Sequence, residues 1–252
     1  MVEIFQQKTR HHQIKIVEEK SIRKLLFGTG MSSEQSAVDL TDLRKHVFDY
    51  SLLSMYSLLF VPDPLEVMMV GLGGGTIPRD MSHYKPNASF DILEIDPYLP
   101  TIASKYFFFD NSSKMDIHIG DAFNTVSNLD KKYDILILDA FLTGYTPFHL
   151  MSVDFLEEVR GLMGAKSVLC ANLCSGHPSF HGQLKTLLAV FNGYDFYTVD
   201  GPRNKFTTML YIAKSVSPDA ELGLPSEYFP PMFPSPLIIT KEIENAEIFR
   251  IE

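Results

Sequence analysis

An apolar run leads directly into a cluster of glycines at Val67-Met68-Met69-Val70-Gly71-Leu72-Gly73-Gly74-Gly75-Thr76. Such a run is typical of a buried strand that turns sharply into a helix. Glycine permits positive φ and lets a ligand approach the backbone more closely than a Cβ would allow. The first turn of the following helix also offers unpaired N–H groups. The pattern therefore predicts a turn that holds an anionic or nucleotide-like group.

A second apolar run ends in acid, at Phe90-Asp91-Ile92-Leu93-Glu94-Ile95-Asp96. Glu94 follows the glycine turn by roughly 20 residues, the spacing at which a carboxylate meets ribose hydroxyls. A carboxylate only accepts hydrogen bonds and can take both hydroxyls at once. The glycine spacing is not G-x-G-x-x-G, and no Gly-Lys-Ser/Thr follows it. The sequence thus favours a nucleoside site over a dinucleotide or triphosphate site.

The size and composition of the chain limit its class. Its 252 residues suit one sizeable α/β domain with a small appendage. The net charge of -9 opposes nonspecific contact with nucleic-acid phosphates or anionic lipid. Cys170 and Cys174 are the only cysteines, the N-terminal residues 1–7 contain no apolar core of signal-peptide length, and no apolar run is long enough to span a bilayer. We therefore expect a cytoplasmic protein with neither a nucleic-acid nor a membrane partner.

Strands and helices alternate after the glycine turn. The apolar patterns predict strands at residues 67–70, 90–95, 115–119, 133–138 and 167–173, and helices at 77–83, 99–107, 124–129, 152–163 and 180–191. This alternation predicts an α/β fold with a Rossmann-like, largely parallel sheet that carries helices on both faces. Two further runs, at 195–199 and 208–213, are expected to form a final antiparallel hairpin.

Three regions are expected along the chain. Residues 1–46 contain short mixed runs that predict a small N-terminal β segment. The Rossmann-like domain is expected to cover residues 47–214 and to begin with a helix at 47–60, which Pro62 and Pro64 end. Residues 215–252 form a C-terminal extension, expected to run extended along the surface through its proline-rich part.

Polar residues follow the predicted parallel strands. Ligands of open parallel sheets collect at the carboxyl ends of the strands, near the switch in strand order. We therefore expect the glycine turn, Glu94, Gly120-Asp121-Ala122 and Asp139 to converge. Asp121 is placed to reach an adenine amino group and the N–H of Ala122 a ring nitrogen. Asp139 faces the reacting end, where it stabilises a cation or takes a proton. An alternative interpretation is that Asp121 or Asp139 is the N-cap of a helix.

A second cluster, formed by Cys170, Cys174, His177 and His181, has spacings that suggest zinc. However, Cys170 lies inside an apolar strand whereas the other three residues follow its end, which does not suit tetrahedral geometry. We expect no metal. Two interpretations of His177 and His181 stay open. One of them contacts a substrate, or both are simply polar residues on a helix surface.

Several motifs together resemble the spermidine synthase (polyamine aminopropyltransferase) family. They are the glycine turn through Arg79, Glu94-Ile95-Asp96-Pro97, Gly120-Asp121-Ala122, and Tyr133 to Phe141 followed by Pro147-Phe148-His149-Leu150. The resemblance runs from roughly Lys24 to Lys214 and identifies the chain as a divergent member. The core of this family is shared with class I methyltransferases.

The resemblance implies a donor, a product and a reaction. Decarboxylated S-adenosylmethionine is the expected co-substrate, methylthioadenosine is the product, and no tightly bound cofactor is expected. An unprotonated amine attacks the aminopropyl carbon next to sulfur, and Asp139 positions or deprotonates that amine. A homodimer is implied as well. The residues implied in donor binding are Gln35, Gly71, Gly73, Gly74, Glu94, Asp121 and Ala122, with Asp139 reaching the donor and Tyr50 on the acceptor side.

Departures from the family pattern bear on the acceptor. Gly74 and Leu142 stand where the family has aspartates, and Ser51-Leu52 follows Tyr50 where the family has His-Glu. A buried ammonium without carboxylate partners is costly, so the sequence does not favour a putrescine site. Two alternatives stay open: an S-adenosylmethionine-dependent methyltransferase and a noncatalytic nucleoside-binding relative.

Overall fold

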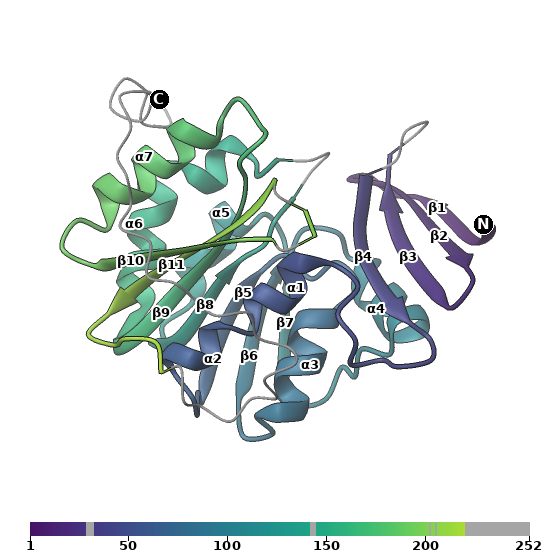
Figure 1. Ribbon diagram of the computed structural model, residues 1–252, viewed down its shortest axis with the longest axis horizontal. Coiled ribbons are helices and arrows are strands. Elements are labelled where there is room, and N and C mark those ends of the chain that lie inside the picture. The colour runs from purple at the N-terminus through teal and green to yellow at the C-terminus, as the bar shows by residue number, and fades with distance from the viewer. Residues whose placement is uncertain (29–32, 142–144, 202, 205, 220–252) are drawn as a thin grey trace.

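Two β-sheets organise the chain (Figure 1). The computed structural model describes residues 1–28, 33–141, 145–201, 203–204 and 206–219. The first sheet is antiparallel, has four strands and confirms the predicted N-terminal β segment. Its strands are β1 (Val2–Lys8), β2 (Gln13–Glu19), β3 (Ile22–Phe27) and β4 (Ser33–Asp39). The second sheet consists of β5 (Glu66–Val70), β6 (Ser89–Glu94), β7 (Met115–Ile119), β8 (Tyr133–Leu138), β9 (Met163–Cys174), β10 (Asp195–Asp200) and β11 (Thr207–Lys214).

The large sheet has the order β10-β11-β9-β8-β5-β6-β7. The strands from β9 to β7 run parallel, while β11 pairs antiparallel with β9 and β10 antiparallel with β11. This arrangement confirms the Rossmann-like sheet and its terminal hairpin. Strand β5 has β6 on one side and β8 on the other, so the strand order switches direction at the glycine turn. That is the position where open α/β sheets bind their ligands.

Helices cover both faces of the large sheet (Figure 1). Successive side chains of β5 point to opposite faces. Val67 and Met69 pack in the layer of α1, α2 and α3, and Met68 and Val70 pack in the layer of α6 and α7. The helices are α1 (Asp49–Ser54), α2 (Ser57–Phe60), α3 (Thr76–Tyr84), α4 (Leu99–Phe107), α5 (Ala122–Thr125), α6 (Val153–Leu162) and α7 (Phe180–Val190), with 3₁₀ turns η1 (Val126–Asn128) and η2 (Phe148–Met151).

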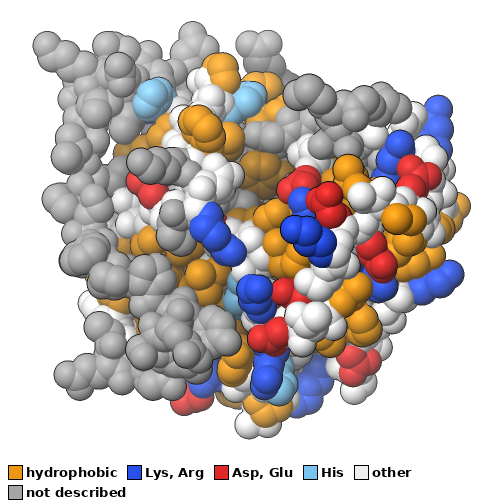
Figure 2. Space-filling model, turned by 45° about the vertical axis from the view of Figure 1, so that its right-hand side comes forward, with side chains coloured by type: hydrophobic (Ala, Val, Ile, Leu, Met, Phe, Trp, Pro, Cys, Tyr) orange, Lys and Arg blue, Asp and Glu red, His pale blue; other side chains and the backbone are white. Residues whose placement is uncertain are grey.

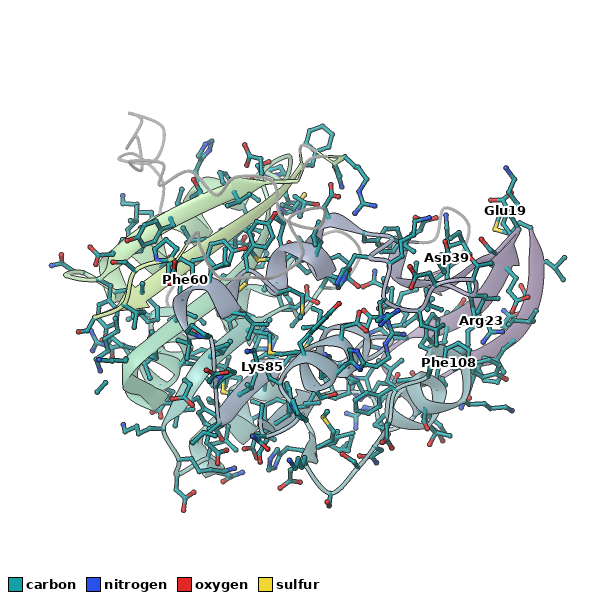
Figure 3. All side chains as sticks on the ribbon, turned by 60° about the horizontal axis from the view of Figure 1, so that its bottom comes forward. Glu19, Arg23, Asp39, Phe60, Lys85 and Phe108 are labelled. Atoms are coloured by element: carbon teal, nitrogen blue, oxygen red, sulfur yellow. The ribbon has the colours of Figure 1, made fainter. Side chains whose placement is uncertain are left out.

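The N-terminal sheet is docked on α4. Ile16 and Leu25 share a buried cluster with Ile102 of this helix. Arg23 of β3 donates from Nη1 to the carbonyl oxygen of Tyr106 at 2.7 Å, and its guanidinium lies 5.9 Å from the ring centroid of Phe108, beside it in Figure 3. The small sheet is thereby fixed next to the carboxyl ends of the large sheet's strands.

The helix predicted over residues 47–60 is wrong as a single element. It is divided into α1 and α2, and it begins at Asp49. Two buried serines interrupt it, because Ser54 Oγ donates to the carbonyl of Tyr50 and Ser57 Oγ donates to the carbonyl of Ser54. Such side-chain bonds compete with the helical backbone pattern.

The helix predicted over residues 124–129 is also displaced. Asp121 caps α5, so the helix begins at Ala122 and continues as the 3₁₀ turn η1. Of the C-terminal extension, the described part runs to Asp219, whose N–H donates to the carbonyl of Leu59 at 2.8 Å. The proline-rich part of the extension lies outside the described residues.

Charged side chains of both signs share the surface. On the face shown in Figure 2, Lys and Arg are interspersed with Asp and Glu, so that face presents no continuous basic track among the described residues. Within the same described ranges, the helices are all too short or too polar to cross a bilayer.

Candidate active site

The turn after β5 adopts a backbone conformation that requires glycine. Gly71, Gly73 and Gly75 have φ angles of 91°, 55° and 70°. At Gly71 a Cβ would lie 2.5 Å from the backbone oxygen of Asp139, so a side chain there would displace the end of β8. The turn therefore lets the end of β5 lie directly against the residue that follows β8.

Gly74 packs on the N-terminal sheet. Its N–H donates to Ser36 Oγ at 2.9 Å, and a Cβ at this position would lie 2.8 Å from the Cβ of Ser36. Ser36 belongs to β4 and is buried. Gly74 does not line either of the two cavities described below. The space that an aspartate side chain would need at this position is thus occupied by Ser36.

Glu94 ends β6 as a buried carboxyl group with backbone partners. Its Oε2 accepts from the N–H of Leu72 and its Oε1 from the N–H of Asp96, both at 2.8 Å. Burial raises the pKa of Glu94 to about 7 because the charged form loses its hydration, and the backbone donors oppose this shift. The glycine turn and the chain after β6 together hold this group in a fixed orientation.

Asp121 has two structural roles. It is the N-cap of α5, because its Oδ1 accepts from the N–H of Phe123 at 3.0 Å. The same oxygen lies 3.1 Å from Nε2 of His149, which belongs to η2. Asp121 and Ala122 also line the cavity described in the next paragraph. Asp121 can therefore be both an N-cap and a residue of the site.

The first cavity has a volume of about 180 Å³ and lies at the carboxyl ends of β5, β6, β7 and β8. The structure brings together here nearly all of the predicted donor residues: Gln35, Gly71, Gly73, Glu94, Asp121, Ala122 and Asp139. The expected convergence of the strand ends is thus present.

The first cavity has a further wall that the sequence did not predict. His12, in the turn between β1 and β2, stacks on Phe27 with ring centroids 4.0 Å apart, and both residues line this cavity. Nδ1 of His12 lies 3.0 Å from Oδ2 of Asp96. Desolvation lowers the pKa of His12, so Nδ1–H of the neutral ring is the donor to Asp96. The N-terminal sheet therefore supports the loop that follows Glu94.

Asp139 lies between the first cavity and a second, larger one of about 330 Å³. Its Oδ1 accepts from Nδ2 of Asn172 on β9 at 2.8 Å. Desolvation raises the pKa of Asp139 to about 7, and the hydrogen bond from Asn172 opposes that shift. At neutral pH this carboxyl group can therefore both accept and release a proton.

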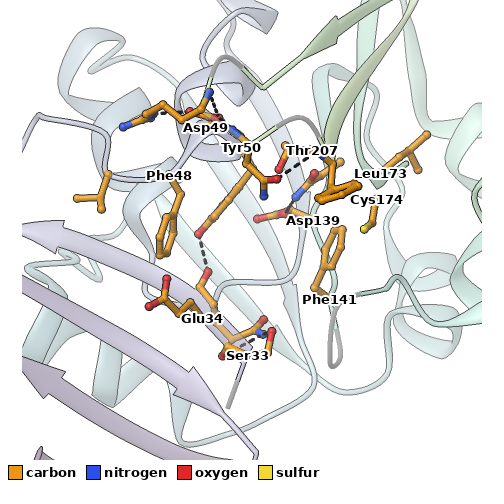
Figure 4. A pocket seen from close by; sticks show the side chains of 16 residues that line it. Ser33, Glu34, Phe48, Asp49, Tyr50, Asp139, Phe141, Leu173, Cys174 and Thr207 are labelled. Atoms are coloured by element: carbon orange, nitrogen blue, oxygen red, sulfur yellow. Dashed lines mark hydrogen bonds and ion pairs between the residues drawn. The ribbon is translucent and has the colours of Figure 1, made fainter. Parts of the chain in front are cut away.

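The second cavity is walled by the β4 strand, the α1 region, the end of β9 and the β10–β11 connection (Figure 4). Tyr50 of α1 lines it, and its hydroxyl donates to the backbone oxygen of Gln35 at 2.6 Å. Burial and the nearby charge of Asp139 hold the pKa of Tyr50 well above its usual range, so the phenol stays protonated. Gln35, Asp139 and Phe141 line both cavities, so the two spaces meet at these residues.

The remaining predictions concern Leu142 and the group of Cys170, Cys174, His177 and His181. Leu142 lies outside the described residues. Cys170 is buried within β9, and Cys170, Cys174, His177 and His181 do not gather at metal-binding distances in the part of the chain that the structure describes. His177 stacks on Tyr145 at 4.9 Å and lies 2.7 Å from Ser179 Oγ, and His177 and His181 are absent from the described lining of both cavities.

Comparison with known proteins agrees with this geometry. A family model described as the spermine/spermidine synthase domain matches residues 48–187, which include the glycine turn, Glu94, Asp121 and Asp139. The polyamine aminopropyltransferase of Vibrio vulnificus (strain CMCP6) is 32% identical over 205 residues, covering 79% of this chain and 68% of that protein.

Solved structures show the same fold. A probable spermidine synthase from Corynebacterium glutamicum superposes with a TM-score of 0.71 at 15% identity, covering 83% of this chain and 79% of that one. A spermidine synthase in complex with the transition-state analogue AdoDATO gives 0.69 at 17% identity, covering 86% and 75%. Together with the family match and the identity to the Vibrio protein, this confirms the resemblance seen in the sequence: the chain belongs to the spermine/spermidine synthase family.

Proposed function

We propose that the protein is a transferase that moves the aminopropyl group of decarboxylated S-adenosylmethionine to an amine. The family membership supports this reaction class. The observation that carries the proposal at the site is the position of Asp139, a carboxyl group on the border between two cavities. A donor held in one cavity and an acceptor held in the other would meet at this side chain.

The first cavity suits the donor nucleoside. Glu94 is fixed by backbone donors at the end of β6 and would accept the ribose hydroxyls. Asp121 and the N–H of Ala122 would bind the adenine edge, and Gln35 together with Gly71 and Gly73 would approach the sulfonium end. The donor is a co-substrate that leaves as methylthioadenosine, so no tightly held cofactor is part of the proposal.

The chemistry needs mainly positioning. A neutral amine nitrogen attacks the aminopropyl carbon bonded to sulfur, so a C–N bond forms as the C–S bond breaks. The electron pair of the broken bond stays on sulfur and neutralises its charge. Asp139 takes the proton of the acceptor ammonium before attack, or holds the amine in line, and its pKa of about 7 suits a base at neutral pH. Because the sulfonium is already activated, orientation and local electrostatics supply the catalysis.

Incubation of the purified protein with decarboxylated S-adenosylmethionine and a panel of amines tests this function. Methylthioadenosine is expected to accumulate only when an acceptor is present, in equal amount to the aminopropylated amine. If no amine on the panel supports its release, aminopropyl transfer is not the reaction.

A methyltransferase is the second candidate, and Gly74 is the observation that favours it. Ser36 fills the space of the aspartate that would face the aminopropyl ammonium, so the site lacks one charge that discriminates the decarboxylated donor. Calorimetric titration of the protein with each of the two sulfonium donors separates the candidates. Aminopropyl transfer requires the decarboxylated donor to bind more tightly, and a methyltransferase requires the reverse.

We also propose a homodimer and a cytoplasmic location, on the basis of the family resemblance. Both cysteines are free thiols in the structure, in agreement with a reducing compartment. Light scattering coupled to size exclusion measures the mass directly, and a monomeric mass would contradict the dimer.

A further inference from the structure

One histidine joins two walls of the first cavity. Asp121 follows β7 at one wall, and His149 lies in η2, within the connection from β8 to α6, at another. Nε2 of His149 lies 3.1 Å from Oδ1 of Asp121, and the two side chains are 39% and 33% exposed. Because a carboxylate only accepts hydrogen bonds, Nε2 carries the proton and donates. His149 therefore acts on the carboxylate that is proposed to bind the adenine.

The imidazole of His149 is held in place by its surroundings. Its ring meets the ring of Phe123, in α5, at an angle of 63° with the centroids 6.1 Å apart. Its backbone carbonyl accepts from Ser152 Oγ at 2.8 Å, and Ser152 is the N-cap of α6. The direction of the hydrogen bond to Asp121 is thus set by two helices and is not left to a freely rotating side chain.

The two carboxylate oxygens of Asp121 have different surroundings. Oδ1 accepts from the N–H of Phe123 at 3.0 Å and from His149 at 3.1 Å. Oδ2 has no hydrogen-bond partner among the described residues. A single donor would leave the carboxylate free to turn about that bond, whereas two donors from different walls fix its plane. Asp121 lines the first cavity, so Oδ2 is the oxygen that remains for a ligand there.

We propose that His149 is a positioning residue of the donor site: it holds Oδ1 of Asp121 and thereby presents Oδ2 to the 6-amino group of the adenine. This inference rests on the nucleoside site of the proposed function and adds to it the residue that fixes its selectivity. In a 6-oxo purine an oxygen replaces the amino group, and the adjacent ring nitrogen carries a hydrogen. Oδ2 and the N–H of Ala122 would then each face a group of their own kind, so the site rejects this base.

Methylthioadenosine and methylthioinosine test the proposal, because they differ only at this edge of the base. Calorimetric titration gives Kd for each ligand. We expect wild type to prefer methylthioadenosine by about a hundredfold, and His149→Leu to reduce the preference to about tenfold. His149→Gln keeps an N–H donor close to the position of Nε2, so its preference should stay within about threefold of the wild-type value.

The ratio of the two Kd values separates positioning from a merely structural role. Both ligands share the ribose and the thioether, so a general loosening of the protein weakens both and leaves the ratio unchanged. His83→Leu replaces an exposed histidine outside the lining of both cavities and should keep the wild-type ratio. A wild-type ratio in His149→Leu overturns the proposal.

Asp121→Asn tests the same orientation with His149 intact. The N–H of Phe123 and Nε2 of His149 would hold the amide oxygen, so the amide nitrogen would take the place of Oδ2 and donate to the base. The preference for methylthioadenosine should therefore fall by about tenfold or more, since a donor now faces the 6-amino group. An unchanged preference in Asp121→Asn overturns the proposal as well.

These titrations are independent of the proposed reaction, because they involve no turnover. If methylthioadenosine binds but no amine supports its release from the donor, aminopropyl transfer is wrong and the ratios still decide the role of His149. If wild type binds the two ligands equally, or binds neither, the positioning role is wrong whichever reaction the protein catalyses.

Discussion

Asn172 of β9 donates a hydrogen bond from Nδ2 to Oδ1 of Asp139, the residue that follows the adjacent strand β8, at 2.8 Å. Asn172 is itself buried. The bond stabilises the charged form of Asp139, while burial favours the neutral form, and the balance gives a pKa of about 7. Burial thus raises the proton affinity of the proposed base, and Asn172 limits the increase.

Replacement of Asn172 by Leu should move the pH profile of turnover to higher pH. The carboxylate form is needed to accept the proton, so the rate falls as pH falls through the pKa of Asp139. Loss of a hydrogen bond to a charged group costs about 1.5–3 kcal/mol, equivalent to about one to two pH units. Measurement of kcat/KM between about pH 5 and pH 9 checks this. Asn111→Leu, at an exposed position, is the control, and coincident profiles of wild type and Asn172→Leu would rule out this role.

Nucleoside binding should also depend on pH, through Glu94. Its pKa is about 7, and ligand hydroxyls that donate to it favour the ionised form. The affinity for methylthioadenosine is therefore expected to rise as pH increases through about 7. Glu94→Gln should lower the affinity by about tenfold or more and remove the pH dependence. Calorimetric titration at several pH values provides the measurement, and a Glu94→Gln protein that binds as wild type does would contradict the assignment.

The two roles of Asp121 are separable by substitution. Asn is as effective an N-cap as Asp, whereas Ala is not, so Asp121→Ala should lose about 1 kcal/mol of unfolding free energy and Asp121→Asn much less. Both variants should bind methylthioadenosine more weakly, because neither offers a carboxylate to the adenine amino group. Urea denaturation and titration of the same preparations compare the two effects. Full affinity in Asp121→Asn would leave only the capping role.

An aspartate at position 74 should destabilise the fold. A Cβ at Gly74 would lie 2.8 Å from the Cβ of Ser36, and overpacking of this kind costs about 1–3 kcal/mol. Gly74→Asp is thus expected to be destabilised, and the added Ser36→Gly should recover part of the loss. Urea denaturation of both single variants and the double variant measures the coupling. Additive effects would show that the contact is not the cause.

The parts of the site that the sequence predicts are those with a local pattern. Gly71, Glu94, Asp121 and Asp139 each follow an apolar strand, and parallel strands bring their carboxyl ends to one edge of the sheet. The same logic predicts the sheet and the helices α3, α4, α6 and α7. Family resemblance adds Gln35 and Tyr50, which the cavities then place near Asp139.

The parts that the sequence did not predict depend on contacts between distant segments. His12 reaches Asp96 across 84 positions of the chain, and Arg203 reaches Asp49 across 154. Neither the periodicity of the sequence nor the spacing of its residues predicts such contacts. The helix predicted at 47–60 is divided for a different reason. Buried serines form hydrogen bonds to backbone carbonyls there, and the spacing of apolar residues does not reveal such bonds.

The most direct measurement of the central claim compares turnover and nucleoside binding in Asp139→Asn. The substitution keeps the size of the side chain but removes the proton acceptor between the two cavities. We expect methylthioadenosine release to fall by about a hundredfold or more, while the affinity for methylthioadenosine stays within about twofold. Turnover equal to that of the wild type would contradict the account, as would a loss of binding that parallels the loss of rate.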